Sequence, residues 1–133
     1  MKAGGLNPLL RLLQSPDLDS IDAAVRCVSQ LTLRPMNDSP IIAAGFLQPT
    51  VKLLSFEDHE NIQSHAARIL RRLAARPENR RDIFNAGAVQ SIEELVLQVP
   101  VRIQIEMTQC IENLSLSGMD PPFNPFSNLI LPR

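Results

Sequence analysis

The side chains best suited to metal chemistry in this 133-residue chain are two histidines and two cysteines. His59 and His65 are six positions apart, and no third ligand stands at a useful spacing from them. A structural zinc site needs four ligands and a catalytic one needs three. The sequence therefore predicts neither a metal site at the histidines nor a bound cofactor.

A run of arginines is the second group with chemical potential. Six arginines fall between positions 68 and 81, and such basic clusters suit the phosphates of nucleic acid. However, no aromatic residues alternate with them to stack on bases, and carboxylates flank the run. These carboxylates are Glu57, Asp58, Glu60, Glu78 and Asp82. We therefore expect a salt-bridged protein surface and no nucleic-acid partner.

No residues have the spacing of a catalytic site. The chain has no Gly-x-Ser-x-Gly elbow, no phosphate-binding glycine loop and no His-Glu-x-x-His pair. Its 13 basic and 14 acidic residues nearly cancel, so no overall charge steers it toward nucleic acid or a membrane. These observations favour a protein that is not an enzyme.

An internal repeat of about 42 residues organises the chain. Residues 44–54 read AGFLQPTVKLL and residues 3–13 read AGGLNPLLRLL, with six of eleven positions identical. A weaker copy at 86–96 keeps the Ala-Gly pair and two apolar closing residues. A period of this length is typical of helical repeats of the armadillo or HEAT kind.

The sequence of each repeat predicts a short, a medium and a long helix. The first repeat is the exception, because it lacks the short helix. Gly45 and Gly87 should end the short helices, and Asp38 or Ser39 should cap the first of them. The expected helices cover 6–14, 19–33, 40–44, 46–55, 59–75, 78–86, 88–97 and 101–117.

One apolar stripe recurs on the long helices in the same register. In the second unit it consists of Ile62, Ala66, Ile69, Leu70 and Leu73. Its equivalents are Ile103, Met107, Cys110, Ile111 and Leu114, and Ser20, Ala24, Cys27, Val28 and Leu31. Cys27 and Cys110 share the slot of Ile69, so we interpret both as small core residues. They lie two units apart, too far for a disulfide.

The fold class that follows is an all-α solenoid, because a single unit cannot bury its stripe alone. We expect units at about 3–36, 37–77 and 78–117, followed by an irregular Pro-rich tail over 118–133. No signal peptide, membrane-spanning run or N-terminal acylation signal is visible, so no direct membrane anchor is expected. A cytoplasmic location is the default prediction.

The Ala-Gly-(Ala/Phe)-(Leu/Val) openings, the medium helices and the Leu70-Arg71-Arg72-Leu73-Ala74 ending resemble the armadillo-repeat family. Gly45-Phe46-Leu47-Gln48-Pro49 and the segments 39–42, 53–56, 86–92, 94–97 and 99–101 are similar to its fungal vacuolar members. The resemblance implies a right-handed superhelix whose long helices line a concave groove for extended partner segments. It further implies an adaptor or scaffold at the cytosolic face of the vacuole, acting in vacuole inheritance, organelle contact or selective autophagy.

The family places an Asn near the end of each long helix, where it holds a bound peptide backbone. That position here holds Gln30, Arg72 and Asn113, so only the third unit keeps the Asn. The resemblance thus predicts a partner-binding strip of seven residues: Arg26, Gln30, His65, Arg68, Arg72, Gln109 and Asn113. Its arginines suggest a protein partner with acidic segments, and a solvated helix face is the alternative.

Two further interpretations stay open at the level of the whole chain. The sequence starts directly on a medium helix and shows no polar cap at either end. It is therefore expected to be a fragment of a longer solenoid, without its own binding activity in the simplest case, or a piece that self-associates through its uncapped ends.

Overall fold

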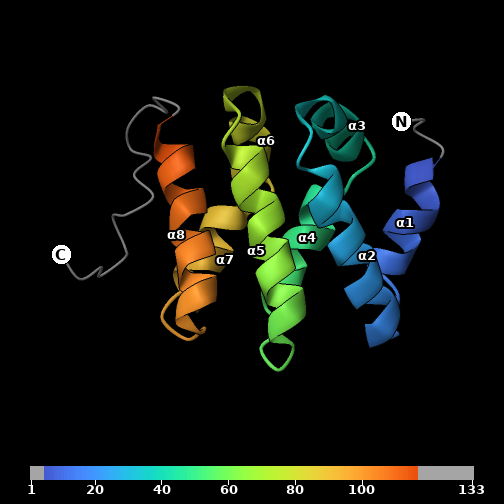
Figure 1. Ribbon diagram of the computed structural model, residues 1–133. Helices are drawn as coiled ribbons and strands as arrows, with labels where there is room; N and C mark the ends of the chain where they lie inside the picture. Colours follow the sequence, from blue (N-terminus) through green and yellow to red (C-terminus); the bar gives the residue numbers. More distant parts are fainter. Residues whose placement is uncertain (1–4, 117–133) are drawn as a thin grey trace.

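The computed structural model describes residues 5–116, which form α-helices, two 3-10 helices and no strand (Figure 1). The tail predicted for residues 118–133 lies outside these residues. The α-helices are α1 (Leu6–Leu13), α2 (Leu18–Leu31), α3 (Asp38–Ala43), α4 (Leu47–Leu53), α5 (Glu60–Ala74), α6 (Arg80–Asn85), α7 (Ala88–Leu95) and α8 (Val101–Ser115). The 3-10 helices are η2 (Pro35–Asn37) and η3 (Pro77–Asn79).

The long helices α2, α5 and α8 stand side by side in one row (Figure 1). The central helix α5 packs against both of the others, and the medium helices α4 and α7 lie behind the row. This arrangement confirms the predicted all-α solenoid. Every predicted helix is present, with its ends within two residues of those expected. The boundaries between units stay a prediction.

The turn after each of the first two long helices follows one local rule, Arg-Pro-x-Asn. Proline lacks the N–H that a continuing helix needs and restricts the residue before it, so the chain leaves the helix there. The asparagine side chain then caps the free carbonyls. Asn37 donates to the Leu31 carbonyl at 2.8 Å, and Asn79 donates to the Leu73 carbonyl at 3.1 Å.

The short helices α3 and α6 end as predicted at glycine. Gly45 has a φ of 91° and Gly87 a φ of 88°, a left-handed conformation that L side chains rarely adopt. The predicted cap at Asp38 or Ser39 is wrong, because both residues are already inside α3. The buried carboxylate of Asp38 accepts a hydrogen bond from Asn79 at 2.8 Å and pairs with Arg76 at 3.3 Å, so it joins two repeats.

The apolar stripe forms the core on α5 and α8 but only partly on α2, where Ser20 and Leu31 are half-buried. All ten stripe residues of α5 and α8 are at most 3% exposed. Cys27 on α2, however, is exposed, so its interpretation as a core residue is wrong. Its equivalent Cys110 is buried and lies near Arg71 of α5, so this position faces the preceding long helix. No long helix precedes α2 among the described residues.

Candidate functional site

The candidate site is the surface that α2, α5 and α8 present on the side of the strip, here called the long-helix face. Each long helix turns its apolar stripe inward, and polar side chains from outside the stripe reach this surface. All seven residues of the predicted strip lie on these three helices. Arg26, Gln30 and Gln109 are exposed, whereas His65, Arg68, Arg72 and Asn113 are half-buried.

Two half-buried arginines of α5 bind a single carboxylate on α8. Arg68 Nε lies 3.4 Å from Glu106 Oε1, and Arg71 Nε pairs with Glu106 Oε2. Sequence reasoning missed Glu106. The repeat offset of 41 places Glu106 of α8 at the position that His65 has in α5, which is three residues before Arg68. Arg68, Arg71 and Arg76 are therefore salt-bridged as expected, although to Glu106 and Asp38 and not to the flanking acids. Arg72 and Arg80 donate to main-chain carbonyls instead.

A second type of contact recurs between neighbouring long helices, at the position where the family carries its Asn. Arg72 Nη1 donates to the Ser29 carbonyl at 2.6 Å, and Asn113 Nδ2 donates to the Arg71 carbonyl at 3.1 Å. Donors and acceptors are equivalent in the two cases, and we call this contact the carbonyl clamp. It occupies two residues of the strip within the solenoid itself. The side chain of Gln30, at the third equivalent position, makes no hydrogen bond to another residue within 5–116.

His65 lies at the centre of the face, between α2 and α5. Its Nδ1 atom is buried and has no hydrogen-bond partner among the described residues. Burial lowers the pKa of His65, and so do the guanidinium groups of Arg68, Arg26 and Arg72. The Asp22 carboxylate opposes this shift. The imidazole therefore favours its neutral form, in which one ring nitrogen accepts a hydrogen bond.

Positive charge is crowded along the middle of the face. Burial first, and then repulsion from Arg68 and Arg71, lower the pKa of Arg72, although a guanidinium stays charged in proteins. Arg26 pairs with Asp22 at 3.0 Å, and Arg76 with Asp38. The five arginines 26, 68, 71, 72 and 76 thus share three carboxylates, which leaves an excess of positive charge.

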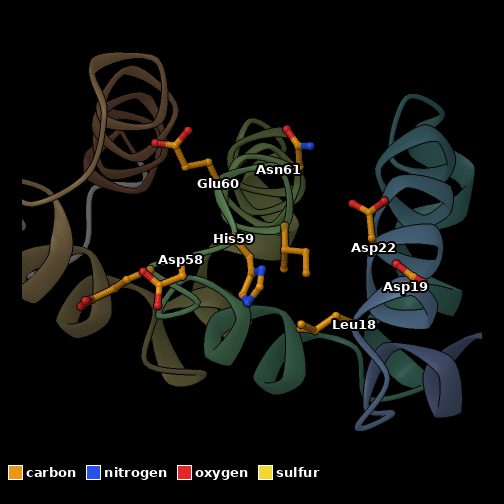
Figure 2. A pocket seen from close by; sticks show the side chains of 9 residues that line it. Leu18, Asp19, Asp22, Asp58, His59, Glu60 and Asn61 are labelled. Atoms are coloured by element: carbon orange, nitrogen blue, oxygen red, sulfur yellow. The ribbon is translucent and has the colours of Figure 1, made fainter.

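The start of α2 and of α5 is acidic. A hollow of about 620 Å³ lies between α2 and α5, and Figure 2 shows Asp19 and Asp22 across it from Asp58, His59 and Glu60. Glu57 also lines it. Glu60 pairs with Arg102 at 3.3 Å. Even so, no three His, Cys, Asp or Glu side chains within residues 5–116 are grouped as metal ligands. The long-helix face is therefore negative where α2 and α5 begin and positive in the middle.

Comparison with known proteins agrees with this architecture. The sequence model of the armadillo/β-catenin-like repeat matches residues 1–33. A designed armadillo repeat protein in complex with peptide (KR)4 superposes with a TM-score of 0.76 and 26% identity, covering 83% of this chain and 46% of the other. Computationally designed armadillo repeat proteins for modular peptide recognition give 0.77 and 26%, covering 83% and 47%.

Two curated proteins named Vacuolar protein 8 are similar in sequence. The one from Saccharomyces cerevisiae is 42% identical over 120 residues, and the one from Schizosaccharomyces pombe is 48% identical over 118. The matches cover 90% and 88% of this chain but only 21% and 22% of the relatives. The chain thus spans about a fifth of their length. Among residues 5–116, no helix is both long and apolar enough to cross a bilayer.

Proposed function

The chain belongs to the armadillo-repeat family, and on this premise we propose that its long-helix face binds an extended segment of a partner protein. One observation carries the proposal. Three consecutive long helices align polar side chains on one face, and Arg26, Gln30 and Gln109 are exposed there while the apolar stripe is buried. The peptide-bound designed protein supports it, since that protein has the same fold.

The proposed role is that of an adaptor or scaffold rather than an enzyme. The similarity to Vacuolar protein 8 supports a place at the cytosolic face of the vacuole. There the resemblance implies a part in vacuole inheritance, organelle contact or selective autophagy. The activity of the full-length relatives is carried over only as a proposal, because this chain matches about a fifth of them.

The proposed partner segment is acidic where it crosses the middle of the face. Five arginines that share three carboxylates leave positive charge for a partner's carboxylates. Arg26 is the most available, because its side chain is 60% exposed and pairs only within α2. Arg68 and Arg72 already have protein partners, so an incoming carboxylate shares them with Glu106 and the Ser29 carbonyl.

The basic alternative rests on the acidic hollow at the start of α2 and α5. A Lys-Arg segment would find complementary negative charge there, and the designed armadillo protein was solved with such a peptide.

A binding titration with two octapeptides, one of alternating Asp and Glu and one of alternating Lys and Arg, separates the acidic from the basic partner. It is carried out at low and at high salt.

We expect the acidic peptide to bind, and we expect its affinity to fall with added salt because salt screens exposed charges. Arg26→Glu should raise its Kd about tenfold, since exposed pairs contribute up to about 1 kcal/mol and the reversal adds repulsion. Arg81→Glu, the same charge change at an exposed site on α6, is the matched control. Binding of the basic peptide alone would refute the acidic partner while leaving the binding face intact.

A map of backbone amide shifts tests the face itself. A bound peptide should perturb residues of α2, α5 and α8 and leave the medium helices α1, α4 and α7 unchanged. Shifts confined to the medium helices would contradict the proposed site.

A further inference from the structure

Positive charge gathers around one ring of the long-helix face, at the junction of α2 and α5. His65, Arg68 and Arg72 stand at positions i, i+3 and i+7 of α5 and therefore lie in one row along it. Burial lowers the pKa of His65, and so do Arg68, Arg26 of α2 and Arg72, so Arg26 lies near the same ring. Within residues 5–116, the carboxylate that acts on the ring against these three guanidinium groups is that of Asp22. We call Arg26, His65, Arg68 and Arg72 the basic cluster.

Each guanidinium group of the basic cluster is held in place and still has donors to offer. Arg26 pairs through Nη2 within α2, Arg68 pairs through Nε with α8, and Arg72 donates through Nη1 to α2. The remaining nitrogens of these side chains make no hydrogen bond within residues 5–116. An arginine carries five N–H donors in a fixed plane, so several donors per side chain are left for a ligand.

His65 adds one accessible nitrogen at the centre of the cluster. Its Nδ1 atom is buried without a partner, whereas Nε2 is not buried and makes no hydrogen bond within residues 5–116 either. The ring can therefore donate through Nε2 to an acceptor that lies above it.

The charge of the cluster fits a dianion. Three guanidinium groups against one carboxylate leave two positive charges around the ring, and the same surplus remains when Arg71, Arg76 and their carboxylates are included. A phosphorylated residue carries a charge of about −1.5 to −2 and three strong acceptor oxygens, so it brings enough charge to one point. Two carboxylates of an extended segment cannot, because neighbouring side chains point to opposite sides and same-side residues are about 7 Å apart.

We propose that the basic cluster is a phosphate-binding site, which takes a phosphorylated residue of the partner segment. The phosphate oxygens accept hydrogen bonds from free N–H groups of Arg26, Arg68 and Arg72, and from His65 Nε2. Guanidinium groups suit this role because they bind phosphate through two parallel hydrogen bonds. The inference rests on the proposed function, since it names the group that the long-helix face recognises on its partner.

A protein segment fits this site better than a membrane surface with the same phosphate groups. The cluster borders the acidic hollow, because Asp22 lines the hollow and also acts on His65. An anionic bilayer would bring negative charge against the acidic starts of α2 and α5 as well. A segment can place a single phosphate over the arginines alone.

Three octapeptides with the same Gly-Ser background test the site on the full chain. One carries a central phosphoserine, one carries Glu at two alternate positions and so has a similar charge, and one is unmodified. The phosphopeptide should bind about tenfold more tightly than the Glu peptide, because its charge and its acceptors converge on one point.

Substitutions in the cluster should weaken the phosphopeptide and spare the unmodified peptide. Arg26→Gln and His65→Gln should each raise the Kd of the phosphopeptide about tenfold, since each removes a hydrogen bond to a charged group. Arg26 is exposed, so its variant should fold normally, which circular dichroism checks. Arg81→Gln removes an exposed charge from α6 instead and should bind like the wild type.

The two histidines of the chain give a second readout by NMR. A bound phosphate should raise the pKa of His65 by about one pH unit, because a nearby anion favours the charged ring. Asp22, Arg26, Arg68 and Arg72 act on this ring in the free protein. The signals of His59, which lines the acidic hollow, should not change when the phosphopeptide is added.

The possible results separate this site from the proposed function. If the Glu peptide binds as tightly as the phosphopeptide, or if the phosphopeptide leaves the His65 ring unaffected, the phosphate site is overturned and the acidic partner stands. The site is also overturned if phosphatidylcholine vesicles containing phosphatidylinositol phosphate bind through Arg26 and His65 while the phosphopeptide does not. Failure of all three peptides to bind would remove both proposals.

Discussion

At the scale of single residues, the side chains of the long-helix face divide into two groups. Arg68, Arg72 and Asn113 hold neighbouring helices together through Glu106 and two backbone carbonyls. Arg26, Gln30 and Gln109 are exposed to solvent. A partner can therefore contact the second group at little cost to the fold, whereas substitutions in the first group change stability as well as binding.

His65 should make the stability of the fold depend on pH. Its pKa is lowered in the folded state, so the unfolded chain binds more protons between that value and 6.5. The free energy of unfolding should therefore fall as pH decreases below about 6.5. Asp22 and Arg26 of α2, Arg68 and Arg72 of α5 all act on the ring.

Urea unfolding of the wild type and of His65→Gln at a series of pH values checks this. The variant should lose the decrease in stability that His65 causes and keep whatever the other groups contribute. Equal slopes for the two proteins in this pH range would show that His65 is not responsible.

The sequence could place the strip residues on one face, but it could not identify their partners. A helical period assigns Arg68 and Arg72 to one side of α5. Whether they contact Glu106 and the Ser29 carbonyl depends on the rotation and spacing of neighbouring helices. The bonded residues are 38 and 43 positions apart in the chain. Likewise, Cys27 and Cys110 occupy the same position in the repeat. Cys110 is buried because a long helix precedes α8, and Cys27 is exposed because none precedes α2 among the described residues.

At the scale of elements, the helices follow from local sequence signals that begin and end them. Proline, glycine and the apolar period predicted the eight α-helices of residues 5–116, because each signal acts over a few residues. The 3-10 turns and their asparagine caps were missed, although Arg-Pro-x-Asn occurs twice, 42 residues apart. Two occurrences of a proline turn do not reveal that the asparagine side chain folds back onto the helix before it.

The glycines that end α3 and α6 are open to a direct test. Gly45→Ala and Gly87→Ala should each lower the free energy of unfolding by about 1–2 kcal/mol, because an L residue at positive φ is strained. The new methyl group would meet nothing within 4 Å, so the cost comes from the backbone alone.

Gly5→Ala is the matched control. Gly5 has a φ of −72° and also has nothing within 4 Å of an added methyl group. Urea denaturation should place this variant close to the wild type. If all three substitutions have equal effects, positive φ is not the cause.

At the scale of the whole molecule, stability depends on the contacts between repeats. Each repeat contacts only its neighbours, so the solenoid has few junctions between repeats. The carbonyl clamp and the Glu106 carboxylate, which Arg68 and Arg71 share, each stabilise one of these junctions. The chemistry of each junction was not visible in the sequence, although its existence followed from the recurring stripe.

Arg72→Ala should lower the free energy of unfolding by about 2 kcal/mol. It removes hydrogen bonds from a charged donor to the Ser29 carbonyl and hydroxyl across the α2–α5 junction. Arg26→Ala, which removes only an exposed pair within α2, should cost about 0.5 kcal/mol. Urea titrations compare the two variants, and equal losses would mean that the clamp does not stabilise the junction.

The acceptor of the clamp is a main-chain oxygen, and this affects how such sequences can diverge. Every residue type supplies that oxygen, so mutation at the acceptor position does not abolish it. Only the donor has to be maintained, and Arg72 and Asn113 already show that side chains of different length and charge reach it. Neighbouring repeats can therefore drift apart in sequence one substitution at a time, without a compensating change, and still remain joined.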